Sequence, residues 1–176
     1  MRIFAISLLI TLFGAPAMAA ASNCDVKDLG AVVATLGQQT NQTRAARGQQ
    51  ELRIDRRLNA AAQRHACDLA RRQAVSHRSG NGARPMGRIR NAGFRACFSA
   101  ENVAQGTKSA DLTVRAWQSS ASHARNQHDP RARAMGFGVA RDGNGQLYWV
   151  GVYATDCRNV AGVQEQSNAR IRPFSW

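Results

Sequence analysis

The sequence predicts a domain of the α+β class, with helices in its first half and strands at its end. Three observations support this prediction. Apolar residues recur at helical spacing over residues 58–69. Residues 135–154 instead have the composition of strands, and the tetrapeptide DGNG at 142–145 divides them as a hairpin turn would. A chain of 176 residues is also long enough for one domain with a full hydrophobic core.

Four segments are expected to be helical: residues 29–47, 56–73, 86–92 and 110–120. Gly48 can end the first helix, Asp55 can cap the second, and Ser109 can cap the last. The second helix is the clearest, because its apolar residues form a stripe along one face. This stripe consists of Leu58, Ala61, Ala62, His65 and Leu69. We expect His65 to be a core histidine, whose ring needs only one or two polar partners.

Strands are expected over residues 99–105, 135–140 and 146–154. The first of them contains a carboxylate in an apolar setting, since Glu101 shares a strand face with Val103 and so lies beside a core position. A carboxylate near the core must find charged or hydrogen-bonding partners, because leaving it unpaired costs several kcal/mol. The candidate partners are His77 and His123, each of which follows an expected helix.

The first 19 residues read as a cleaved secretory signal. Arg2 precedes an apolar run over residues 3–13, and Ala17-Met18-Ala19 supplies the small residues of a cleavage site. A membrane anchor, the alternative, would need a longer apolar run. We therefore expect one domain over residues 20–157, a loosely held extension over 158–176, and no transmembrane segment after cleavage. The mature protein is expected to be a monomer that is periplasmic or extracellular.

Four cysteines remain in the mature chain, and an even number in an exported protein favours two disulfides. Three pairings are open. Cys24 and Cys157 flank the expected domain, so a bridge between them would tie its ends together and leave Cys67 with Cys97. The alternative, a zinc cluster of these cysteines, lacks the CxxC or CxxH spacing that such sites use.

The chain is strongly basic, with a formal charge of +13 and arginine as 22 of its 24 basic residues. Such a charge attracts anionic partners over a long range, among them envelope polymers, lipid head groups and nucleic acid. The arginines are scattered and have little aromatic interleaving, which argues against a nucleic-acid groove. An anionic envelope component, a lipid or a protein surface is the expected partner.

Six motifs then occur in order between residues 29 and 154: SHRSGNG, RIRNAGF, SAENVAQG, WQSSASHARN, AMGFGVA and YWVGVYA. In this series the chain resembles the bacterial branch of the CAP superfamily, the cysteine-rich secretory, antigen 5 and pathogenesis-related proteins, also called SCP domains. The resemblance implies a three-layer α-β-α sandwich with a central, mainly antiparallel sheet. It also implies a cleft at which two histidines and one or two acids converge.

Carried over to this sequence, the cleft residues of the family are His77, Glu101 and His123. Where many members have a second glutamate, this chain has Ser120. Two imidazoles and a carboxylate can hold Zn²⁺ or another divalent cation with a position open for water. The same residues can equally form a metal-free polar cluster that stabilises the cleft, so no cofactor is certain.

The expected function is a binding or interaction module at the cell envelope or outside the cell. The alternative is a metal-dependent hydrolase in which Glu101 acts as ligand or general base. Arg78 and Arg125 adjoin the two cleft histidines in sequence, and we expect them to attract anions to its mouth. His128 is expected in a solvated loop. Core packing is the default expectation for Trp117, Tyr148, Trp149 and Tyr153.

Overall fold

The computed structural model describes residue 24 and residues 26–158. The expected signal sequence and most of the expected extension lie outside these residues, so the domain boundaries stay predictions. The described part contains five helices and four strands in the order α1, β1, α2, α3, β2, α4, α5, β3, β4. The helices are α1 (Leu29–Ala45), α2 (Arg56–Arg72), α3 (Pro85–Asn91), α4 (Ala110–Ser119) and α5 (Ala121–Gln127). The strands are β1 (Arg53–Ile54), β2 (Ala96–Gln105), β3 (Ala134–Arg141) and β4 (Leu147–Asp156).

The strands form one sheet in the order β1-β3-β4-β2, in which β1 runs parallel to β3 and the other pairs are antiparallel. The predicted hairpin joins β3 to β4. At its turn Asp142 donates its backbone N–H to Gln146 O at 2.9 Å, and Gly145 has a φ of +85° that favours glycine. The mainly antiparallel sheet is therefore confirmed.

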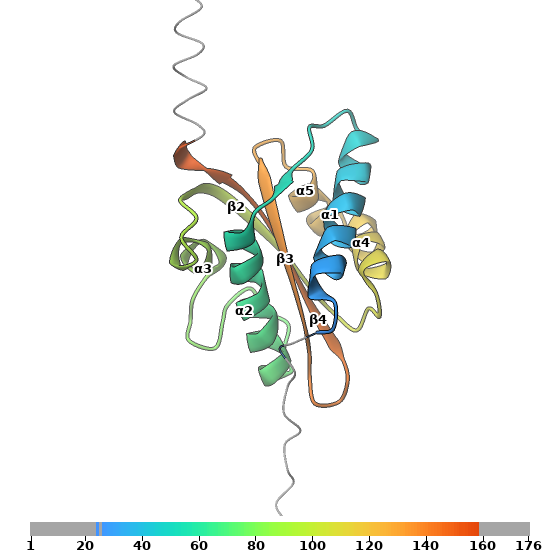
Figure 1. The fold of residues 1–176 in the computed structure, drawn as a ribbon, viewed down its shortest axis with the longest axis vertical. Helices are drawn as coiled ribbons and strands as arrows, with labels where there is room; N and C mark the ends of the chain where they lie inside the picture. The colour runs from blue at the N-terminus through green and yellow to red at the C-terminus, as the bar shows by residue number, and fades with distance from the viewer. Residues whose placement is uncertain (1–23, 25, 159–176) are drawn as a thin grey trace, which may run out of the picture.

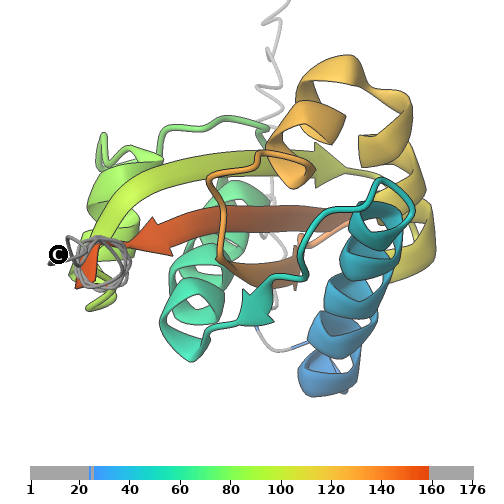
Figure 2. The same cartoon turned by 90° about the horizontal axis from the view of Figure 1, so that it is seen from above.

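Helices cover both faces of the sheet. In Figure 1, α2 and α3 lie on one side of β3 and β4, and α1, α4 and α5 lie on the other; Figure 2 shows the same layers from above. Along β4, Tyr148 and Val150 pack with the core of α2 and α3, whereas Trp149 and Tyr153 pack with α1 and α4. This alternation buries both faces and gives the predicted α-β-α sandwich. The four large aromatic residues expected in the core, including Trp117, are buried.

The helix α2 lies unusually close to β3. A Cβ atom at Gly136 or Gly138 would overlap the backbone of α2. This approach lets two side chains of α2 bind the edge of β3 that β1 leaves uncovered. Asn59 Oδ1 accepts from the N–H of Phe137, and Gln63 Oε1 accepts from the N–H of Val139, both at 2.9 Å. Side chains of α2 thus accept hydrogen bonds from the backbone N–H groups of β3 that no neighbouring strand covers.

Two elements differ from the sequence prediction. The strand β1 has only two residues, Arg53 and Ile54, too few to show a periodicity. The helix α5 was not expected either: it follows α4 after the single residue Ser120, whose extended backbone ends one helix and begins the next. No helix within the described residues is both long enough and apolar enough to cross a membrane.

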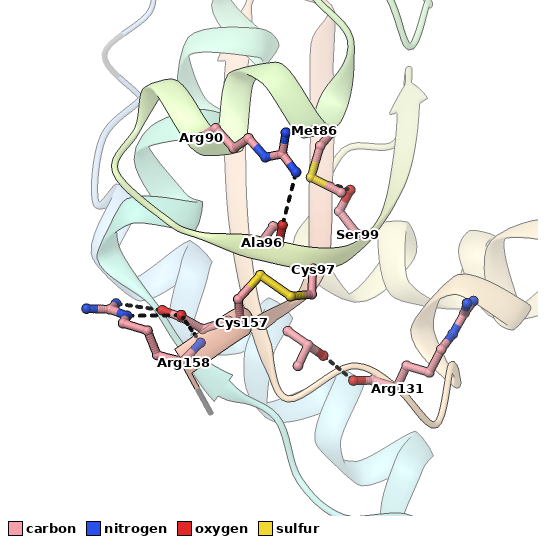
Figure 3. The surroundings of a disulfide bond; sticks show 10 residues. Met86, Arg90, Ala96, Cys97, Ser99, Arg131, Cys157 and Arg158 are labelled. Carbon is pink, nitrogen blue, oxygen red and sulfur yellow. Dashed lines mark hydrogen bonds and ion pairs between the residues drawn. A yellow bond between two sulfur atoms is a disulfide. The ribbon is translucent and has the colours of Figure 1, made fainter. Parts of the chain in front are cut away.

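The expected disulfide pairing is wrong, although all four cysteines are bonded. The bridges join Cys24 to Cys67 and Cys97 to Cys157. Cys24 lies against α2, where Gln63 Nε2 donates to its carbonyl at 2.8 Å. Because β2 pairs antiparallel with β4, the start of β2 and the end of β4 are adjacent, and Cys97 meets Cys157 there (Figure 3). Each bridge thus ties one end of the described domain to its nearest element.

Candidate functional site

Glu101 on β2 is the centre of the candidate site. Its side chain is only 2% exposed, and both carboxylate oxygens have partners. Oε2 lies 2.5 Å from Arg88 Nη2, and Oε1 lies 2.9 Å from His77 Nδ1. The sequence prediction that Glu101 needs a charged or hydrogen-bonding partner is met on both sides of the carboxylate.

Arg88 on α3 is the residue that sequence reasoning missed. Its side chain is 9% exposed. Besides Glu101 it binds the loop that leads into α3: Nη1 donates to the carbonyl oxygens of His77 at 3.1 Å and Ala83 at 2.7 Å. Arg88 belongs to the RIRNAGF motif, but nothing in its spacing marks it as a partner of β2. A buried glutamate that needs a counter-charge was the only available signal.

His77 forms the exposed part of the site, with 57% of its side chain accessible. Its Nδ1–H donates to Glu101, so the carboxylate raises the pKa of His77 above its ordinary value, against a smaller opposing effect of burial. Among the described residues, none hydrogen-bonds to the second ring nitrogen, Nε2. A protonated His77 therefore offers an N–H donor to a ligand.

His65 lies behind the site and is the core histidine that the sequence predicts. Its ring is fully buried, Nε2–H donates to Ser76 O at 2.8 Å, and Nδ1 accepts from the Ser79 hydroxyl at 3.1 Å. Burial lowers the pKa of His65, which favours the neutral ring. Both nitrogens are used to hold the loop after α2, so His65 positions His77 from behind.

His123 lies on α5, which packs against β2, but none of the hydrogen bonds among the described residues joins its ring to Glu101 or His77. Two asparagines dock this helix on β2: Asn102 Nδ2 donates to the carbonyl of His123 at 3.0 Å, and Asn126 Nδ2 donates to the carbonyl of Glu101 at 3.0 Å. Burial, followed by the positive charge of His77, lowers the pKa of His123. Ser120, the residue at the place of the second glutamate, contacts Ser122 at 3.3 Å between hydroxyls.

Two other predictions about this region need correction. His128 is not a solvated loop residue: it is 7% exposed and ends α5, with Nδ1 3.0 Å from Gln49 Oε1 and Nε2 2.9 Å from Gln118 Oε1. Arg125 lines a pocket with Arg47 and His128, and His77 is not among the residues of that pocket. Arg125 lies about 200° around α5 from His123, at about 100° per residue. Arg78, which follows His77 in the sequence, is exposed, and its attraction of anions stays a prediction.

The predicted metal ligands do not fit a divalent cation as they are arranged. Zinc needs several donors with free lone pairs pointing at one position. Here both oxygens of Glu101 face hydrogen-bond donors, and one of the donors is the permanent positive charge of Arg88. In the described part of the chain, no three His, Cys, Asp or Glu side chains are arranged to hold a metal ion. The geometry favours the metal-free polar cluster.

This arrangement is suited to binding. A buried, paired carboxylate holds an exposed imidazole in a fixed orientation, and the imidazole presents one nitrogen outward. The carboxylate itself is a poor general base, because its lone pairs are directed at Arg88 and His77. When His77 is protonated, the site therefore offers a positioned hydrogen-bond donor, and Arg78 is exposed next to it in the sequence.

Known proteins share this fold and sequence pattern. The cysteine-rich secretory protein (CAP) family model matches residues 38–153. Uncharacterized protein YkwD of Bacillus subtilis (strain 168) is 28% identical over 105 residues, which are 60% of this chain and 41% of that protein. This chain thus spans less than half of the length of that relative.

Several solved structures are similar to this chain. An extracellular protein containing an SCP domain from Bacillus anthracis has a TM-score of 0.67 and 17% identity, over 73% of this chain and 41% of that one. An outer surface protein from Borrelia burgdorferi has a TM-score of 0.64 and 21% identity, over 69% of this chain and 90% of that one. These likenesses show the fold, and the family model covers most of the described domain. The chain belongs to the cysteine-rich secretory protein (CAP) family.

Proposed function

We propose that this protein is an exported binding module whose cleft recognises an anionic or strongly hydrogen-bond-accepting group without transforming it. The observation that carries this proposal is the pairing of both Glu101 oxygens, one with Arg88 and one with His77. Because of this pairing, Glu101, the one acid predicted for the cleft, stabilises the structure and is not free to act on a ligand. What remains accessible is the outward nitrogen of His77.

The charge of the molecule supports an anionic ligand. The chain carries +13, and Arg78 is exposed next to His77. The carboxylate of Glu101 is already balanced by Arg88 at 2.5 Å, so it does not repel an incoming anion as a free acid would. Long-range attraction by the whole surface would concentrate such a ligand near the cleft.

Export is part of the same proposal. Two disulfides suit an oxidising compartment, and the first 19 residues have the pattern of a secretory signal. Two proteins with this fold are described as an extracellular protein and an outer surface protein. We infer a periplasmic or extracellular location, and an anionic component of the cell envelope as the ligand.

Equilibrium binding to isolated envelope fractions tests this function. We expect saturable binding by the oxidised protein that a chelator does not change and that His77→Ala weakens. Arg115→Ala is the matched control, because Arg115 is an exposed cation on α4 and lies outside the cleft. Equal weakening by both variants would show that the binding depends on the overall charge of the protein and not on the cleft.

The hydrolase alternative is tested on the same preparation. Metal analysis of the purified protein and turnover of peptide, ester and phosphodiester substrates give its readouts. The hydrolase function would be favoured over the binding function by two results together. The protein would contain stoichiometric metal, and both a chelator and Glu101→Gln would abolish turnover.

A further inference from the structure

A polar pocket lies on the side of α5 that faces away from β2 and Glu101. Its volume is about 530 Å³, and it is bounded by the turn after α1, the end of α4 and one face of α5. These segments lie at one end of the molecule (Figure 1). The cations on its wall are Arg47, from the turn, and Arg125, from α5.

The helical period explains why α5 serves two sites. Ala121, Ala124, Arg125 and His128 line the pocket, and they fall within about 100° of one another around the helix. His123 and Asn126 lie on the opposite side, toward β2. The pocket is therefore separate from the Glu101 cleft, although both use the same short helix.

The charges that line this pocket are unbalanced. Its one carboxylate, Asp129, already pairs with Arg131 at 2.7 Å, and that hydrogen-bonded pair lowers the pKa of Asp129. Neither Arg47 nor Arg125 makes an ion pair with any residue that the structure describes. Both guanidinium groups are exposed and available to a ligand.

The wall behind these arginines is polar and fixed. His128 is more than nine-tenths buried and lies between two glutamines, Gln49 and Gln118. The amide of Gln49 also donates to the carbonyl of His128 at 2.7 Å. Burial, then the positive charges of Arg47 and Arg44, lowers the pKa of His128. Arg47 of the pocket and the buried Arg44 of α1 thus both place positive charge near His128.

We propose that this pocket is a binding site for a phosphate monoester. A guanidinium binds phosphate oxygens through paired N–H donors, and two such groups without counter-ions balance the charge of about −1.5 to −2 on a monoester near neutral pH. A carboxylate or a phosphodiester carries a single negative charge and would leave one arginine unbalanced. The site is independent of Glu101 and His77.

Titration of the full oxidised protein with inorganic phosphate and with glycerol 3-phosphate tests this site, followed by NMR or calorimetry. We expect saturable binding that Arg47→Gln/Arg125→Gln weakens by at least about tenfold, the scale of one or two charge-assisted hydrogen bonds. Arg125→Lys, which keeps the charge and loses the paired donors, should weaken it by a smaller factor. Bound phosphate should also raise the pKa of His128.

The matched control is Arg56→Gln/Arg115→Gln, which removes the same charge from exposed positions outside the pocket. His77→Ala, the cleft variant, should leave phosphate binding unchanged, so failure here is distinct from failure of the proposed function. Equal loss in both double variants, or acetate or anionic phosphodiester vesicles binding as tightly as the monoester, would overturn the proposal.

Discussion

Glu101 makes its two contacts with residues of very different exposure. The side chain of Arg88 is 9% exposed, whereas that of His77 is 57% exposed. The arginine contact is therefore a buried ion pair in which each charge depends on the other, and the histidine contact faces solvent. Removing one partner of a buried pair leaves an uncompensated charge, which is the costly case.

Glu101→Gln should lower the free energy of unfolding by about 3–5 kcal/mol, because Arg88 then lacks its buried counter-charge. Urea unfolding followed by circular dichroism measures the change. Arg71→Gln is the control: its side chain is 59% exposed and 3.9 Å from Asp68, so the loss should be within about 0–1 kcal/mol. Equal effects of the two variants would contradict a buried pair at Glu101.

The pH dependence of stability should reveal the contact between His77 and Glu101. The pKa of His77 is raised in the folded protein, so its stabilising contribution is complete below the unfolded value of about 6.5 and is lost as the pH rises through the folded value. The difference in stability between wild type and His77→Gln should therefore be largest in mild acid and shrink above neutrality.

The other charged and titratable groups around His77 are Arg88 on α3, His65 on α2 and His123 on α5. Burial lowers the pKa values of both histidines, so their own contributions change in the opposite direction, toward lower stability in acid. His65 and His123 are present in both wild type and His77→Gln, so their contributions largely cancel when the two stabilities are subtracted. A difference that is flat with pH, or that grows above neutrality, would show that His77 is not held by Glu101.

The elements that the sequence predicts are those with local signals. The helix α2 has a cap at Asp55 and an apolar stripe, and the β3–β4 hairpin has its DGNG turn. In contrast, β1 is defined by two residues paired with β3, and α5 has a sequence, ASHARNQ, without an apolar stripe. The helix α5 is held by the asparagine contacts with β2, which no local pattern displays.

The close packing of α2 on β3 predicts that the stability of the fold depends strongly on the glycines of β3. Gly138→Ala should destabilise the fold by at least about 1–3 kcal/mol, because the added methyl group overlaps the backbone at Ala62 and Gln63. Thermal or urea unfolding measures this. Gly87→Ala is the matched change in α3, where nothing lies within 4 Å of the new methyl group, and it should be neutral or stabilising by up to about 1 kcal/mol. Similar losses at both positions would argue against this helix–strand contact.

For the whole molecule, the layered fold and the meeting of Glu101 with His77 were predictable through the family resemblance, but two features were not. The bridge pattern depends on which chain ends lie together, and the sequence does not reveal that Cys157 ends a strand beside Cys97. The role of Arg88 depends on how α3 packs against β2. Both features depend on long-range contacts, and nothing in the sequences of the two segments indicates that they pack together.

Removing either disulfide should lower the stability of the protein independently of the other. Cys24→Ser/Cys67→Ser and Cys97→Ser/Cys157→Ser should each cost about 2–4 kcal/mol, since the bridges close loops of 43 and 60 residues. Peptide mapping of the wild type without reductant should recover these two linked pairs and no other. A peptide that links Cys24 to Cys157 would contradict the structure.

The bridges also follow one another along the chain, since the first pair is complete at Cys67 before the second begins at Cys97. An oxidase that joins each new thiol to the previous unpaired one, as the polypeptide emerges from a membrane pore, would produce the native pattern at the first attempt. With this order of closure, maturation would need an oxidant but no disulfide shuffling.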